Sequence, residues 1–102
     1  MVRTRQVSPV ELVDLYLARI EELNPAIEAY LTVAGDQARE SARAAESAVG
    51  NDDLPPFHGV PISIKDLTDT AGIRTTHGTA EWAERVPEVD EEVVARIRRG
   101  GF

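Results

Sequence analysis

One stretch of the sequence, residues 59–66, alternates like a β-strand and restricts the possible fold more than any other feature. One face of this predicted strand carries Val60, Ile62 and Ile64. The opposite face carries Pro61, Ser63 and Lys65. No other stretch is as convincing a buried strand, and a single strand leaves its backbone donors and acceptors without partners. The sequence therefore predicts part of a larger α/β fold, or a chain that pairs with another chain.

Lys65 has an unusual place in this pattern, near the end of a largely apolar strand and just before a turn. A surface lysine at the end of a strand is one interpretation, because most lysines are exposed. A lysine whose proton is to be moved is the other, because such a residue needs apolar surroundings. Alternation alone leaves both interpretations open.

The first of three predicted helices begins at Ser8. Ser8 and Glu11 have the spacing of a capping box, and Pro9 suits the first helical position. An apolar stripe at helical spacing follows, and Asn24-Pro25 is expected to end the helix.

Residues 27–33 alternate and predict a short strand or extended segment. A second helix is predicted from near Asp36 to Val49, stopped by Gly50. Its apolar positions are mostly alanines, which allow a neighbour to approach closely but bury little area. A connection rich in turn residues then leads into the strand at residues 59–66.

A third helix is predicted to open within residues 87–90 and to end at the cap Gly100-Gly101. Acidic residues at its start and arginines at its end complement the helix dipole. The sequence stops at Phe102, where the next strand of an α/β unit is expected. We therefore expect an incomplete fold.

Composition excludes several classes of function. The formal net charge is −7, so nonspecific nucleic-acid binding is not expected. There is no cysteine, so a thiolate nucleophile is not expected. His58 and His77 lack the helical spacing and the neighbouring acidic residues of a zinc site, so a metal centre is not expected. No apolar run has the length of a membrane span or a signal peptide. A cytoplasmic protein is predicted.

The run from residue 59 to residue 78 resembles the amidase signature family of serine hydrolases. The residues that match the family pattern are Gly59, Pro61, Lys65, Asp66, Gly72, Thr75, Thr76 and Gly78. The predicted helices match the opening of these enzymes, so the resemblance covers nearly the whole chain. Leu67 and Thr79 differ from the residues that are common in the family. The resemblance implies that residues 1–102 are the N-terminal segment of one amidase domain, truncated after the third helix.

The resemblance implies a Ser–cis-Ser–Lys triad in which Lys65 is the base. One serine attacks the amide carbonyl, and the second relays its proton to the lysine. A free lysine has a pKa of about 10.4 and must be made neutral by burial to act as a base. The other matched residues are expected to shape the site, with Asp66 fixing the turn after the strand. No cofactor is implied, and the substrate is a small amide.

Both triad serines and the oxyanion loop lie, in the family, beyond the position of Phe102, so the isolated chain is expected to be inactive. Ser63 lies near Lys65 on the same strand face, but no oxyanion donor accompanies it, so it is not favoured as a nucleophile. His77 could act as a general base, but a solvated loop histidine is favoured, and Trp82 is expected to be a packing residue.

Two alternatives to a simple amidase remain. The parent protein is also consistent with the A subunit of a glutamyl-tRNA amidotransferase, which would release ammonia from glutamine for a partner subunit. A non-catalytic truncated relic, or a module that folds only on pairing, is the other. Homo-oligomer formation is open, and direct contact with nucleic acid or membrane is not expected.

Overall fold

Helices provide the regular secondary structure in the residues that the computed structural model describes, 1–2 and 4–102. In chain order they are α1 (Pro9–Ile27), α2 (Gly35–Ala48), the 3-10 helix η1 (Ala80–Trp82) and α3 (Glu92–Gly100). These described residues form no β-strand, and their one β-bridge joins Val49 to Asn51. The α/β prediction thus holds only for its helices, and the partial sheet is not found.

The start of α1 has the predicted capping box. The Ser8 hydroxyl accepts hydrogen bonds from the backbone N–H groups of Val10 and Glu11, at 3.0 and 3.3 Å. The Glu11 carboxylate accepts one from the Ser8 backbone N–H at 3.2 Å. These bonds satisfy donors that a helix start leaves free, and Pro9 has no N–H to satisfy. The predicted start is confirmed.

The end of α1 lies beyond the predicted stop. Pro25 sits inside the last turn, and the helix ends at Ile27, after which Glu28 adopts a left-handed conformation with φ 48°. A proline disfavours a helical residue before it but does not forbid one. The Asn24 side chain steadies this end: its amide donates to the Tyr30 carbonyl at 2.9 Å, and its oxygen accepts from the Tyr30 N–H at 2.8 Å.

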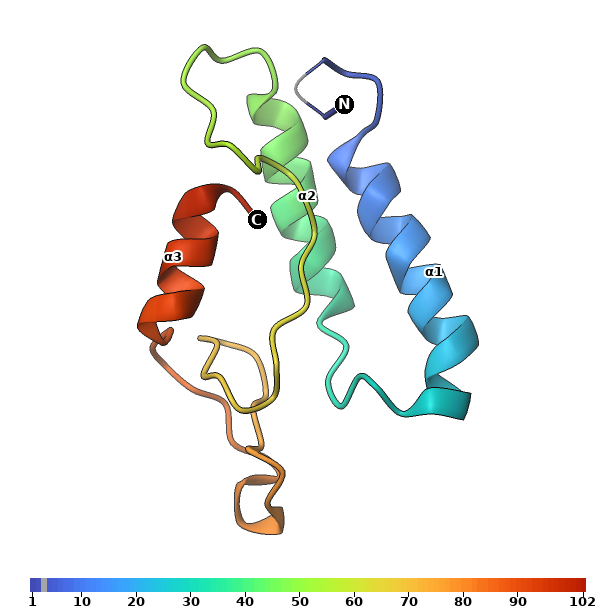
Figure 1. The fold of residues 1–102 in the computed structure, drawn as a ribbon, viewed down its shortest axis with the longest axis vertical. Coiled ribbons are helices and arrows are strands. Elements are labelled where there is room, and N and C mark those ends of the chain that lie inside the picture. The colour runs from blue at the N-terminus through green and yellow to red at the C-terminus, as the bar shows by residue number, and fades with distance from the viewer. Residues whose placement is uncertain (3) are drawn as a thin grey trace.

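The helices α1 and α2 pack side by side and run in opposite directions, as Figure 1 shows. Each contributes a buried apolar side chain, Val13 from α1 and Ala42 from α2. An ion pair also joins the two helices, with Arg39 Nε 2.8 Å from Asp14 Oδ1. The bounds of α2 agree with the prediction within one residue.

Residues 27–33, predicted as a short strand or an extended segment, form no strand. Ile27 belongs to α1, and residues 28–34 form an irregular connection to α2. Side chains bond the backbone of this connection in place of a neighbouring strand. Asn24 holds both backbone groups of Tyr30, and Arg74 Nη1 lies 3.4 Å from the Leu31 carbonyl oxygen. Alternation in a sequence cannot supply the partner that a strand requires.

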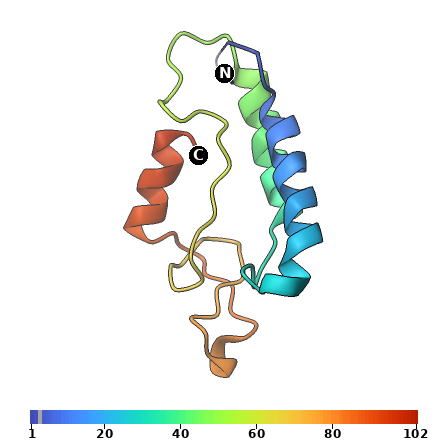
Figure 2. The ribbon, with the colours of Figure 1, turned by 45° about the vertical axis from the view of Figure 1, so that its right-hand side comes forward.

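Residues 59–65 run along the molecule between α2 and α3 (Figures 1 and 2). Within the described residues, the backbone of 62–64 forms no hydrogen bond to another backbone group. Val60 and Ile62 are 37% and 47% exposed, so the predicted burial of this stretch is wrong, and the described residues do not form the predicted strand. The stretch is an extended segment without the neighbouring strands that would complete a sheet. We call residues 59–65 the lysine segment.

The helix α3 begins at Glu92, later than the opening predicted within residues 87–90. Asp90 does not cap the helix, because its carboxylate bonds elsewhere. It accepts a hydrogen bond from the Ala71 backbone N–H at 2.7 Å and pairs with Arg98 Nε at 2.9 Å. Asp90 therefore fixes the start of α3 to the loop that precedes η1.

The C-terminal end of α3 docks on the start of the lysine segment. The backbone N–H groups of Phe57 and Gly59 donate to the carbonyl oxygens of Gly100 and Gly101, both at 2.9 Å. Gly101 is the left-handed cap, with φ 100°, and a Cβ there would lie 2.6 Å from Pro55 Cγ. The predicted glycine cap is confirmed, and close packing adds a second reason for glycine.

The described chain is thin, measuring 45 × 31 × 17 Å. Its buried apolar side chains are few and small: Val2, Val13, Ala42, Val49 and Val94. In the part of the chain that the structure describes, we find no helix with the length and apolar character to cross a membrane.

Candidate active site

Lys65 lies on an open groove of about 1100 Å³. The groove is lined by residues of α1 and α2, by the connection between these helices, by residues 61–68 and by residues of the loop that follows, between 70 and 78. The Lys65 side chain is exposed and forms no hydrogen bond or ion pair with the described residues. It is the only lysine in the sequence. The predicted apolar burial of this amine is therefore not provided within the described chain.

Gly59 anchors the start of the lysine segment against the start of α1. Its φ is 75°, and a Cβ on it would lie 2.8 Å from Pro9 Cγ. Any side chain would therefore both strain the backbone and collide with α1. Pro61, two residues on, lines the groove beside Lys65. Both predicted residues thus shape the approach to the lysine.

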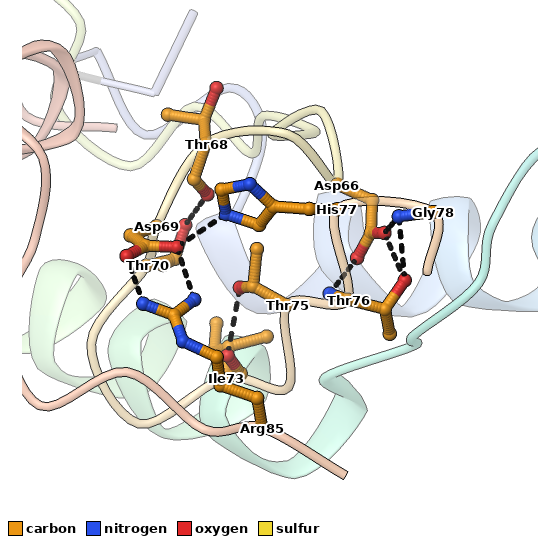
Figure 3. A network of polar contacts seen from close by, with 10 residues as sticks. All are labelled: Asp66, Thr68, Asp69, Thr70, Ile73, Thr75, Thr76, His77, Gly78 and Arg85. Carbon is orange, nitrogen blue, oxygen red and sulfur yellow. Dashed lines mark hydrogen bonds and ion pairs between the residues drawn. The ribbon is translucent and has the colours of Figure 1, made fainter. Parts of the chain in front are cut away.

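Asp66, directly after Lys65, is fixed by the loop at residues 76–78, as Figure 3 shows. Its carboxylate accepts hydrogen bonds from the Thr76 backbone N–H at 2.9 Å, from the Thr76 hydroxyl at 2.5 Å and from the Gly78 N–H at 3.3 Å. Its own carbonyl accepts from the His77 N–H at 3.0 Å. The end of the lysine segment is thereby tied to the Thr-Thr-x-Gly loop.

The same contacts keep Asp66 ionised. The hydrogen bond from the Thr76 hydroxyl is the largest cause that holds the pKa of Asp66 below its usual value, and the backbone N–H groups act in the same direction. Hydrogen bonds to a carboxylate favour its charged form. Asp66 is therefore an acceptor that holds the loop, and it is not suited to proton transfer near neutral pH.

Gly72 and Thr75 belong to one loop stretch, which runs antiparallel to the stretch at residues 85–87. The Gly72 N–H donates to the Pro87 carbonyl at 2.9 Å, and the Thr75 N–H donates to the Arg85 carbonyl at 3.0 Å. The Thr75 side chain is 3% exposed. These bonds close residues 66–91 into one unit, which we call the loop unit.

An ion cluster lies at the centre of the loop unit (Figure 3). Arg85 grips the Asp69 carboxylate with two nitrogens, at 2.6 and 2.5 Å, and His77 Nε2 lies 2.8 Å from the same carboxylate. The bonds from Arg85, and after them the bond from His77, hold the pKa of Asp69 well below its usual range. No motif in the sequence indicates this cluster.

His77 is not the solvated loop residue that was predicted. Its side chain is 26% exposed, its backbone has φ 52°, and its ring packs against Trp82 in a T-shaped arrangement with centroids 4.9 Å apart. Trp82 itself is 39% exposed and stacks under the Arg85 guanidinium at 4.9 Å. Trp82 thus packs within the loop unit and does not enter a core.

A metal site is not formed by the described residues, which contain no group of three or more His, Asp or Glu side chains placed to hold an ion. His58 is buried, and its Nε2 donates to the Ala45 carbonyl at 2.8 Å. This histidine therefore has a structural partner in α2.

The predicted site residues fall into two groups in space. The first surrounds the groove and consists of Pro61, Lys65, Asp66, Thr75 and Gly78. The second holds the backbone around it and consists of Gly59, Gly72 and Thr76. The structure therefore offers a positioned amine and a fixed carboxylate, and the described serine nearest in sequence, Ser63, bonds the Tyr30 hydroxyl at 2.7 Å.

The profile of one protein family matches most of the chain, from residue 11 to residue 102, and this family is the amidases. The chain belongs to the Amidase family. The resemblance inferred from residues 59–78 is thereby confirmed.

Curated relatives of this amidase-family chain include two bacterial proteins, each named as the A subunit of glutamyl-tRNA(Gln) amidotransferase. The protein from Azoarcus sp. (strain BH72) is 42% identical over 98 residues, which are 96% of this chain and 20% of the relative. The protein from Geobacter sulfurreducens is 41% identical over 97 residues, 95% of this chain and 20% of the relative. The chain thus spans about a fifth of the length of these relatives.

A solved structure shows the same fold. It comes from a study of an unexpected vestigial protein complex that reveals the evolutionary origins of an s-triazine catabolic enzyme. The TM-score is 0.89 at 24% identity, and the match covers 98% of this chain and 22% of that chain. At this identity the likeness establishes the fold alone.

Proposed function

We propose that this chain is the lysine-bearing N-terminal segment of an amide C–N hydrolase, with Lys65 as the base. The observation that carries the proposal is the placement of Lys65. Its amine is free of partners among the described residues and faces an open groove, while Gly59 and Asp66 fix the backbone on either side. A base needs an unblocked nitrogen in a fixed position.

In the proposed hydrolysis, protons move between two serines, Lys65 and the leaving nitrogen. A serine hydroxyl attacks the amide carbonyl carbon, and its proton passes through a second serine to the neutral Lys65 amine. The Lys65 ammonium then returns the proton through the second serine to the leaving nitrogen, so the C–N bond breaks, and water later hydrolyses the acyl ester to release the acid and restore the serine hydroxyl. Both serines and the oxyanion donors come, in this proposal, from polypeptide outside residues 1–102. That polypeptide also covers the groove and disfavours the charged form of Lys65.

Substitution of Lys65 in the full-length protein tests the proposal. Lys65→Ala is expected to lower kcat for hydrolysis of a primary amide by about 10²- to 10⁴-fold, the usual contribution of a general base. Lys65→Arg is expected to be as inactive, because a guanidinium stays protonated. Ser63→Ala is the matched control on the same segment and should keep turnover. Near-normal activity of Lys65→Ala would refute the assignment.

A second candidate is the A subunit of a glutamyl-tRNA amidotransferase, which the names of the curated relatives support. The parent would then hydrolyse glutamine and pass ammonia to a partner subunit. Glutaminase activity that rises when partner subunits are added distinguishes this candidate from a free-standing amidase. A cytoplasmic location belongs to either candidate and stays a prediction.

A non-catalytic pairing module is the third candidate. The exposed apolar side chains of Leu31, Ile62 and Leu67 on the groove favour it, because apolar surface of this kind needs a cover. A stably folded protein of this length without amide hydrolysis would select this candidate over the two enzymes.

A further inference from the structure

Arg74 is held in a fixed orientation by neutral acceptors. Its Nε bonds the Ala83 carbonyl oxygen, and its Nη1 lies 3.2 Å from Thr32 Oγ1 and 3.4 Å from the Leu31 carbonyl oxygen. A guanidinium has five N–H donors in a rigid plane. The second terminal nitrogen, Nη2, has no hydrogen-bond partner among the described residues. Arg74 therefore presents an oriented end with free donors.

No carboxylate neutralises Arg74 in the described chain. Six other arginines form ion pairs with carboxylates: Arg19, Arg39, Arg85, Arg96, Arg98 and Arg99. Two further described arginines, Arg5 and Arg43, form no such pair, but neither lines the groove. In a chain with a net charge of −7, an unpaired and half-buried guanidinium is the exception.

Arg74 lines the same groove as Lys65. Its charge also reaches the end of the lysine segment, where it is one of the causes that lower the pKa of Asp66. The acidic residues on the groove are Glu28 and Asp66. Asp66 is occupied by Thr76 and Gly78, and Glu28 forms no ion pair with Arg74. Arg74 is thus the one arginine on the groove, and it has no ion-pair partner among the described residues.

We propose that Arg74 binds a carboxylate of the substrate, so that the site beside Lys65 takes amides that carry a second, negatively charged carboxylate group. This inference rests on the function proposed above and names its substrate class. The free donors of the guanidinium match the geometry of a carboxylate, and a charge-assisted bond there orients the amide end toward Lys65.

A purely structural role for Arg74 is the competing explanation. Its three acceptors join the connection between α1 and α2 to the loop unit, so Arg74 also fastens two parts of the fold together. Loss of a fastener would lower activity toward every amide alike. Loss of a carboxylate-binding group would lower it selectively.

Matched substrates separate the two roles in the full-length protein. Glutaramate and valeramide are primary amides of similar length, with and without a terminal carboxylate. Arg74→Gln is expected to lower the ratio of their kcat/KM values by about 10- to 100-fold, the range for loss of a charge-assisted hydrogen bond, mainly through the KM of glutaramate. Arg74→Lys, which keeps the charge, should restore part of the ratio.

Arg43→Gln is the matched control, because it removes an arginine charge from α2 at a position away from the groove. It is expected to leave the glutaramate-to-valeramide ratio unchanged. A ratio that stays the same in Arg74→Gln, or equal losses on both substrates, would overturn the inference in favour of the fastener.

Binding of glutarate gives a readout that needs no turnover. Calorimetry is expected to show glutarate binding to Lys65→Ala protein and a loss of about 10-fold or more in affinity when Arg74→Gln is added. Glutarate binding that depends on Arg74, without any hydrolysis that depends on Lys65, would keep this inference and refute the proposed function. Hydrolysis that depends on Lys65, without glutarate binding that depends on Arg74, would do the reverse.

Discussion

Asp69 makes the loop unit sensitive to acid. Its pKa is lowered by Arg85 and His77, so the folded protein binds this proton less tightly than the unfolded chain, whose aspartates titrate near about 3.9. The stabilisation is therefore present above that pH and is lost as the pH falls below it. The lowered pKa of Asp66 acts in the same direction.

We expect Asp69→Asn to flatten the acid side of the stability profile. The free energy of unfolding, measured in urea between pH 7 and pH 2, should fall less steeply with acid in the variant than in the parent protein. Asp52→Asn, in an exposed turn, is the control and should keep the parent's slope. Identical slopes for Asp69→Asn and the parent would contradict the assigned role of the cluster.

Gly59 and Gly72 form a matched pair for testing close packing. Their φ values are 75° and 74°, but a Cβ on Gly59 would press on Pro9, whereas a Cβ on Gly72 would meet nothing within 4 Å. Gly72→Ala should cost about 1–2 kcal/mol from the left-handed backbone alone. Gly59→Ala should cost about 1–3 kcal/mol more, as overpacking does. Urea unfolding measures the loss of stability in both variants. Equal losses would show that Pro9 can move away from the added Cβ without cost.

Some residues of the site can be predicted from the sequence, and others cannot. Lys65, Asp66, Thr76 and Gly78 follow a fixed local pattern, and the structure does link Asp66 to that loop. The ion cluster gave no such signal, because Asp69 and His77 stand eight positions apart in a loop without periodicity. Only the folded path of the loop brings them together.

At the scale of elements, the capping signals were reliable, whereas the Asn24-Pro25 stop came too early and the predicted strands were not formed. The caps of α1 and α3 depend on residues within a few positions, and both were predicted from them. The lysine segment has a strand-like pattern, but a strand also needs a neighbour, and neighbours are set by distant parts of the chain. The late start of α3 has the same kind of cause. The Asp90 carboxylate bonds the Ala71 N–H, 19 positions away, and the sequence pattern does not indicate this distant partner.

Removing the cap of α1 should weaken this helix measurably. Ser8→Ala removes the acceptor for two backbone N–H groups and should lower the free energy of unfolding by about 1 kcal/mol. Ser47→Ala is the control, because that hydroxyl only donates to a carbonyl within α2. Circular dichroism in urea compares the two. A Ser8→Ala variant as stable as Ser47→Ala would contradict this role and show that Glu11 and Pro9 are enough to stabilise the start of α1.

At the scale of the whole molecule, the described chain has little interior. Its buried apolar side chains are mostly valines and alanine, while larger ones such as Leu31, Ile62 and Val89 are 59%, 47% and 75% exposed. The helices α1 and α2 support one another, but α3 contacts neither of them and rests on the loops. Stability is therefore expected to be uneven across the chain.

Hydrogen exchange should reveal this unevenness. In the 102-residue chain, the amides of residues 62–64 are expected to exchange near their intrinsic rates, because they have no backbone acceptor, whereas those inside α1 and α2 should be slower. In the full-length protein the same amides should become protected if strands flank them. Protection in the 102-residue chain alone would contradict the unpaired segment described above.

The lysine segment is fastened at both ends and unpaired between them. Gly59 is wedged against α1 and bonded to the end of α3, and Asp66 is bound by the Thr76 loop. Side chains between these two anchors can therefore be exchanged without moving the backbone that carries Lys65. Substitutions at Val60, Ile62 and Ser63 would then change the polarity around the amine without changing the position of its backbone. One backbone framework could thus hold the lysine in many chemical environments.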